Sequence, residues 1–230
     1  MNRILEVCAG SIESIRAAHQ GGAQRIELCS ALSEDGLSPS EGMLRCALAQ
    51  EGLAVHVLIR PRAGDFVYSE AEVQSMVDDI RRCHELGVQG VVIGALTPEG
   101  DIDLPTCRRL VAEAGGMNIT FHRAFDACRH PQQALEDIIT LGCTHLLTSG
   151  QARTAEEGIP MLRQLVEQAA GRIIIMPGAG VNEKNAARIL RETGATQIHG
   201  SARSNRLFGR LETDPAIVAE IVTQLRTLDL

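Results

Sequence analysis

Short apolar runs alternate with longer amphipathic segments along the whole chain. The apolar runs have the length of strands, and we expect strands at residues 4–8, 25–29, 55–59, 90–94, 118–122, 145–149, 173–176 and 197–200. Several runs are apolar on both faces, for example Ile173-Ile174-Ile175-Met176. Such runs are typical of parallel strands that helices cover.

The segments between these runs carry helix start and stop signals. Ser38-Pro39-Ser40-Glu41 predicts a helix with Ser38 as its N-cap, a proline in its first position and an acid in its third. Ser69 and Glu72 have the spacing of a capping box, and Asp214-Pro215 opens the last predicted helix. A glycine stands where each of the first seven helices should end: Gly22, Gly52, Gly87, Gly115, Gly142, Gly171 and Gly194.

Eight strand–helix units follow one another with no linker between them. This pattern predicts one α/β domain over residues 1–230, a (β/α)8 barrel (TIM barrel) of eight parallel strands. An open, doubly wound sheet shows the same alternation, but it would be expected to carry a glycine-rich dinucleotide fingerprint after its first strand. Cys8-Ala9-Gly10-Ser11-Ile12 does not match that fingerprint, so we expect the barrel and no nucleotide cofactor.

Composition narrows the class of protein. The 22 basic and 29 acidic residues give a net charge of −7, and 44% of residues are hydrophobic, as in an ordinary globular domain. The acidic balance and an aromatic content of 2% argue against nucleic-acid binding. The scarcity of aromatics also predicts a barrel interior of layered aliphatic side chains.

Cysteine usage and hydropathy indicate a compartment. Seven cysteines, an odd number without a CxxC motif, are typical of free thiols in a reducing environment. We find neither a signal-peptide pattern at the N-terminus nor an apolar run that approaches about 18 residues, so we expect no membrane association. These features together predict a cytoplasmic protein.

Polar residues gather at the carboxyl ends of the predicted strands, where barrels of this kind carry their sites. Glu6, Glu27, His122 and Asp126 are the candidate acid and base groups. Two simpler interpretations remain open: the glutamates pair with Arg60 or Arg62 inside the barrel, and His122 with Asp126 forms a satisfied buried pair.

Candidate anion ligands lie in the loops after the third, fifth, sixth, seventh and eighth strands. They are Arg60, Arg62, Arg123, Ser149, Gly178, Gly180 and Ser201. Backbone N–H groups of glycine-rich loops often bind phosphate at this place in a barrel. The alternative is that the glycines only form tight turns.

Two cysteines share strand faces with the candidate carboxylates. Leu5-Glu6-Val7-Cys8 and Ile26-Glu27-Leu28-Cys29 have the same pattern, which brings Cys8 and Cys29 to the predicted mouth, and Cys128 follows the fifth strand closely. Thiolates are soft ligands that suit Cu(I). Buried packing is the competing interpretation, because free cysteine behaves as a small hydrophobe.

The chain resembles the CutC family of copper homeostasis proteins over nearly its whole length. The most specific matching segments are Phe121-His122-Arg123-Ala124-Phe125-Asp126 and Leu147-Thr148-Ser149-Gly150-Gln151. The resemblance implies a (β/α)8 barrel, a cytosolic dimer or larger homo-oligomer, and a role in copper tolerance through Cu(I) binding. It also implies that Cys8 and Cys29 correspond to the copper ligands proposed for the family.

Two functions are therefore open. One is copper homeostasis, with Cu(I) bound by Cys8 and Cys29 and a histidine or Cys128 as a further ligand. The other is an enzyme, an isomerase, lyase or hydrolase, that acts on a small phosphorylated or carboxylated metabolite in the polar mouth.

Overall fold

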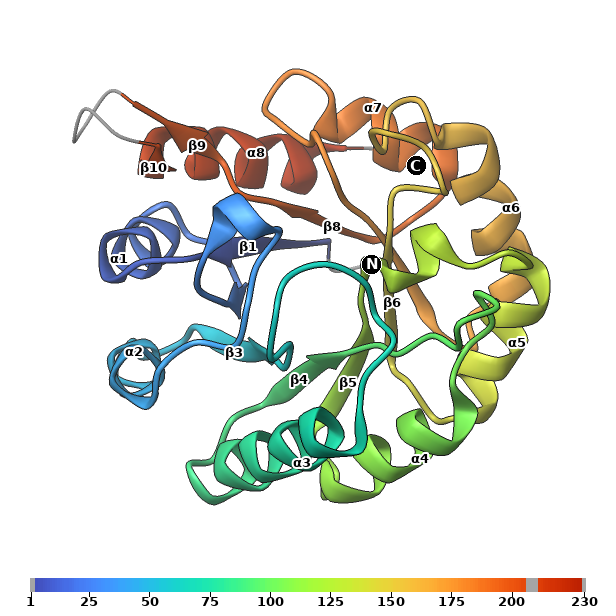
Figure 1. Ribbon diagram of the computed structural model, residues 1–230. Coiled ribbons are helices and arrows are strands. Elements are labelled where there is room, and N and C mark those ends of the chain that lie inside the picture. Colours follow the sequence, from blue (N-terminus) through green and yellow to red (C-terminus); the bar gives the residue numbers. More distant parts are fainter. Residues whose placement is uncertain (1–2, 206–210, 229–230) are drawn as a thin grey trace.

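The computed structural model describes residues 3–205 and 211–228, and within them eight parallel strands form the wall of a barrel (Figure 1). The strands are β1 (Ile4–Ala9), β2 (Arg25–Leu28), β3 (Ala54–Leu58), β4 (Gly90–Ile93), β5 (Asn118–Phe121), β6 (His145–Thr148), β7 (Ile174–Pro177) and β8 (Gln197–Gly200). Hydrogen-bonded pairing runs in the order β7-β6-β5-β4-β3-β2-β1-β8, and β7 and β8 lie side by side. The predicted barrel of eight parallel strands is confirmed.

Helices surround the strands (Figure 1). They are α1 (Ile12–Gln20), α2 (Glu41–Leu48), α3 (Glu70–Glu85), α4 (Leu104–Glu113), α5 (Pro131–Thr140), α6 (Ile159–Ala169), α7 (Ala186–Thr193) and α8 (Pro215–Thr227), with short 3-10 turns at Leu32–Glu34 and Arg123–Ala127. In the described residues, no helix combines the length and apolar character that a bilayer crossing needs.

The helix signals of the sequence are confirmed with two exceptions, both at α2, which ends at Leu48 with Ala49 as its C-cap and not at Gly52. Ser69 and Glu72 form the capping box of α3, and Asp214 caps α8. The N-cap of α2 is Ser40 rather than Ser38. Ser38 instead accepts a hydrogen bond from the backbone N–H of Arg60 at 3.0 Å, because the loop after β2 packs against the end of β3.

The barrel interior differs from the aliphatic layers that the composition predicted. Aliphatic residues such as Leu5 and Val7 point outward into the core between strands and helices. The inward positions carry a buried polar layer that includes Glu6, Arg25 and His145. A charged group is stable there only when partners surround it, so this layer depends on specific pairing.

A short antiparallel hairpin precedes the last helix. It consists of β9 (Arg203–Ser204) and β10 (Glu212–Thr213), and β10 packs against α1, where Ser11 and Ser14 donate hydrogen bonds to Glu212. Strands of two residues are too short to produce a hydrophobic period, so the sequence did not predict this hairpin.

Candidate functional site at the barrel mouth

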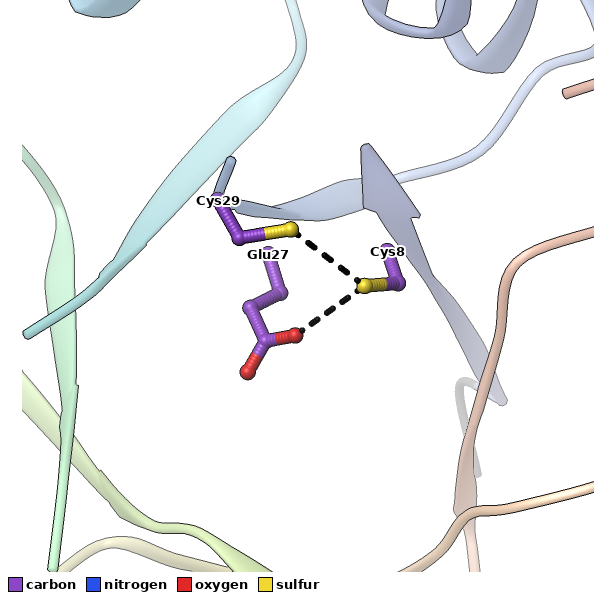
Figure 2. A group of neighbouring side chains, drawn as sticks. All are labelled: Cys8, Glu27 and Cys29. Carbon is purple, nitrogen blue, oxygen red and sulfur yellow. Dashed lines mark hydrogen bonds between the residues drawn. The ribbon is translucent and has the colours of Figure 1, made fainter. Parts of the chain in front are cut away.

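Two thiols and a carboxylate meet at the carboxyl ends of β1 and β2 (Figure 2). The Sγ atoms of Cys8 and Cys29 are 3.6 Å apart, and the Cys8 thiol donates a hydrogen bond to Glu27 Oε2 at 3.3 Å. One ligand atom from each residue lies within 4.8 Å of the other two. This thiol–carboxylate cluster is compact enough for its three atoms to contact a single ion.

Strand geometry explains why these three residues meet. Cys8 pairs directly with Glu27 in the register of β1 and β2, and side chains alternate along a strand, so both point into the barrel. Cys29 lies two positions after Glu27, on the same face, and its N–H donates to the Ala9 carbonyl at 3.1 Å. The Glu-x-Cys pattern on two neighbouring strands therefore forms the cluster.

His199 joins this cluster to a deeper carboxylate. Its Nδ1 donates to Glu6 Oε1 at 2.9 Å, and its Nε2 is 3.7 Å from Glu27 Oε2. Glu6 itself is fully buried and forms an ion pair with Arg25. The sequence interpretation that paired Glu6 or Glu27 with Arg60 or Arg62 is wrong, because the start of β2 supplies an arginine directly opposite Glu6.

The pKa values follow from this network. Burial opposes the charge on Glu6, but Arg25 and His199 outweigh it and hold the pKa of Glu6 well below its usual range. The hydrogen bond with Cys29, together with burial, raises the pKa of the Cys8 thiol. Burial also raises the pKa of Glu27. Burial alone would lower the pKa of His199, yet its contacts with Cys8 and both glutamates raise it well above its usual value.

A cavity of about 690 Å³ opens above the cluster. Cys8, Glu27 and His199 line its inner part, and Cys29 lies behind them, fully buried. Volumes of this size are typical of small-molecule sites. The polar residues predicted at the mouth of the barrel thus line a cavity.

The structure brings some of the predicted acid–base and anion-binding residues into this cavity and not others. Its lining includes Arg60, His122, Arg123, Asp126, Gly180 and Ser201. The lining does not include Arg62, Ser149 or Gly178. Arg62 pairs with Glu72 at 2.6 Å and Asp65 at 2.9 Å, and the Ser149 hydroxyl donates to the Ala152 carbonyl at 2.6 Å.

Asp126 organises the loop after β6. Its carboxylate accepts hydrogen bonds from the Thr148 hydroxyl and from the N–H groups of Ser149 and Gln151, and it pairs with Arg123 at 2.8 Å. His122 uses Nδ1 to accept the Ala124 N–H at 3.1 Å. The interpretation of a His122–Asp126 pair is therefore wrong, because each residue takes its partners from elsewhere.

Sequence reasoning missed the residues that complete the network. Arg25 opens β2, far from the carboxyl end where barrel sites are expected, and His199 on β8 is not among the site residues predicted from the sequence. The register of β1 with β8, which opposes Glu6 to His199, is the signal that identifies His199. Cys128, which is expected near the same mouth, is not part of the thiol–carboxylate cluster. It lines a separate cavity with residues of the α4 and α5 region.

The cluster has the chemistry of a soft-metal site. Two thiols can bind a soft cation once deprotonated, and the carboxylate beside them can accept a released proton. All seven cysteines are free thiols, so none is committed to a disulfide.

Comparison with known proteins finds a matching family and several proteins of similar sequence. The model of the CutC family matches residues 3–204. The family protein CutC of Parabacteroides distasonis is 54% identical over 205 residues, 89% of this chain and 84% of its own, and that of Chromobacterium violaceum is 52% identical over 203 residues, 88% and 82%.

Comparison with solved structures also finds a CutC protein. A CutC protein from Streptococcus agalactiae, whose name assigns it to copper homeostasis, superimposes with a TM-score of 0.83 at 34% identity, covering 86% of this chain and 98% of its own. Thiamine phosphate pyrophosphorylase from Pyrococcus furiosus, at 20% identity and a TM-score of 0.65 over 98% of this chain and 96% of its own, shares the fold alone. The family match, the level of identity and the barrel together lead to one conclusion: the chain belongs to the CutC family.

Proposed function

We propose that this protein binds Cu(I) between Cys8 and Cys29 and serves copper homeostasis in the cytosol. The observation that carries the proposal is the 3.6 Å separation of the two Sγ atoms at a cavity that opens from the barrel mouth. Cu(I) is soft and prefers thiolate ligands, and a reducing compartment keeps both the ion and the thiols in the required state. The name of the Streptococcus agalactiae relative, a copper homeostasis protein, supports a role in copper homeostasis.

Binding has to release the thiol protons, because the pKa of Cys8 is raised in the metal-free protein. Glu27 is the hydrogen-bond acceptor of the Cys8 thiol, and His199 lies next to both. We infer that Glu27 takes up one of the two thiol protons and that the other leaves the site, while His199, whose pKa is already raised, keeps its charge. The net charge of the buried region then stays the same when Cu(I) enters.

The geometry favours this proposal over acid–base catalysis. Two of the four candidate acid and base groups already have strong partners: Glu6 is fully buried against Arg25, and Asp126 accepts several hydrogen bonds from the β6 loop. Glu27 accepts from the Cys8 thiol, and His122 accepts the Ala124 N–H and keeps only Nε2 without a partner among the described residues. The homodimer or larger homo-oligomer expected from the family resemblance stays a prediction, which sedimentation of the metal-free protein tests.

Anaerobic titration of the reduced, metal-free protein against a Cu(I)-selective chelator tests the copper proposal. We expect one Cu(I) bound per chain, with protection of Cys8 against alkylation rising in step with copper loading. Zn(II) at the same concentration serves as the comparison ion and should protect less, because it favours four ligands and the cluster offers two thiols and a carboxylate. Failure to take Cu(I) from the chelator, or binding that leaves Cys8 equally reactive, would contradict the proposal.

A further inference from the structure

Arg60, Phe66 and His122 form a second group of side chains in the wall of the mouth cavity, which we term the arginine wall. Phe66 lies between the other two: Arg60 Cζ is 5.1 Å from the centre of the Phe66 ring, and the His122 ring is 5.0 Å from it. The copper proposal uses none of these three residues.

Arg60 is a buried cation without a carboxylate partner in the described residues. It is 5% exposed, and its Nη atoms donate to the carbonyls of Glu34 at 2.7 Å, Gly36 at 2.9 Å and Gly64 at 2.9 Å. Its Nε is buried and finds no acceptor in the part of the chain that the structure describes. Carbonyl groups orient the guanidinium but do not neutralise it, and a buried charge is costly unless an opposite charge accompanies it.

His122 presents a second donor without a partner. Nδ1 accepts the Ala124 N–H, so the single proton of a neutral ring resides on Nε2. Burial and the charge of Arg60 lower the pKa of His122 to about 3, which keeps the ring neutral. Among the described residues, the buried Nε2 has no partner. An unsatisfied buried donor of this kind destabilises the protein, and a ligand acceptor removes that cost.

Neighbouring loops add further donors around the same cavity. Arg123, Arg203 and Ser201 line it, and the Arg123 charge is shared with Asp126. Three acidic residues also line it: Glu27 lies at the thiols, Asp126 pairs with Arg123, and Asp35 is an exposed residue of the loop whose carbonyls bind Arg60. Arg60 and His122 are buried N–H donors on this side of the cavity, and neither forms an ion pair with a carboxylate among the described residues.

We propose that the arginine wall binds the oxyanion group, phosphate or carboxylate, of a small metabolite. Arg60 supplies the compensating charge, and His122 donates a hydrogen bond from Nε2 to one ligand oxygen. The cavity volume of about 690 Å³ holds a small molecule whose remaining atoms extend toward Cys8 and His199. This site is separate from the copper ligands and does not depend on them.

Inorganic phosphate and acetate, added to the metal-free protein at matched ionic strength with chloride as the reference, test the proposal. Calorimetry and thermal unfolding should detect binding of at least one of the two oxyanions and none of chloride; phosphate identifies a phosphorylated metabolite, and acetate alone a carboxylated one. Nitrogen-edited NMR should show the His122 Nε2–H resonance shift on addition of the anion that binds. Absence of stabilisation by either oxyanion would overturn the proposal.

Matched variants locate the anion. Arg60→Gln should weaken oxyanion binding about 10- to 100-fold, the range for loss of a charged hydrogen-bond donor. Arg153→Gln, at a highly exposed arginine that pairs with Glu157 outside the cavity lining, should leave it unchanged. If Arg60→Gln does not fold, the NMR shift of His122 in the unaltered protein decides the question. Equal binding by folded Arg60→Gln, or an anion that leaves the His122 resonance unmoved, would contradict the assignment.

Discussion

Replacing Arg25 with methionine will lower the free energy of unfolding by about 3–5 kcal/mol, the typical cost of removing one partner of a buried ion pair. Arg25 is 5% exposed and Glu6 is fully buried, so water cannot solvate the carboxylate that remains. Methionine keeps much of the side-chain length, which limits the loss of packing.

The size of this effect follows from the position of Arg25 in the barrel. Its guanidinium contacts Glu6 on β1, donates to Gln197 on β8 and to Met176 Sδ on β7 at 3.2 Å, and lies 3.4 Å from His145 Nε2 on β6. One side chain thus links four strands to its own across the barrel interior. Its loss leaves both a buried charge and several unsatisfied polar groups.

Urea unfolding of the Arg25→Met and Glu6→Gln single variants and of the double variant measures the free energy of interaction between Glu6 and Arg25. Glu6→Gln in the Arg25→Met background should be less destabilising than in the unaltered protein, because the charge it removes is then unpaired. Arg153→Met removes an exposed pair with Glu157 and should cost less than about 1 kcal/mol. A loss below about 1 kcal/mol for Arg25→Met would show that the polar layer does not hold the barrel together.

Replacing both Cys8 and Cys29 with serine will weaken Cu(I) binding on the order of 100-fold or more, because the hard hydroxyl oxygen is a poor ligand for a soft ion. The two side chains supply both sulfur atoms of the cluster, and Glu27 alone cannot replace them. Competition with a Cu(I)-selective chelator measures the affinity directly.

Cys46→Ser is the matched control, because Cys46 is a partly exposed thiol on α2 outside the cavity lining. It should bind Cu(I) as the unaltered protein does. Circular dichroism and urea unfolding establish that the double variant is folded before its affinity is compared. Retained Cu(I) affinity in the folded double variant would exclude Cys8 and Cys29 as the ligands.

The fold could be predicted from the sequence because its signals are local. Apolar runs, caps such as Ser69 and glycines at helix ends all depend on residues close in sequence. The polar barrel interior could not be predicted, because the partners of Arg25 come from four strands spread between residues 6 and 197. Only the register of those strands shows that a charge at the start of β2 is compensated.

The candidate site could be predicted from the sequence where its residues lie on regular strands, and less well where they lie in loops. The Glu-x-Cys pattern and strand alternation brought Cys8, Glu27 and Cys29 together correctly. Loop residues were harder: Arg60 and Arg62 are two positions apart, yet one lines the cavity and the other pairs with Glu72 at the start of α3. The direction of a side chain in an irregular loop depends on tertiary contacts that no periodic pattern encodes.

Anomalous diffraction at the copper absorption edge, from crystals of the reduced protein loaded with one equivalent of Cu(I), tests the copper site most directly. The proposed site predicts a single strong peak within bonding distance of both Cys8 Sγ and Cys29 Sγ, beside Glu27 at the mouth of the barrel. A copper peak elsewhere in the molecule, or no ordered copper in crystals that remain reduced, would contradict it.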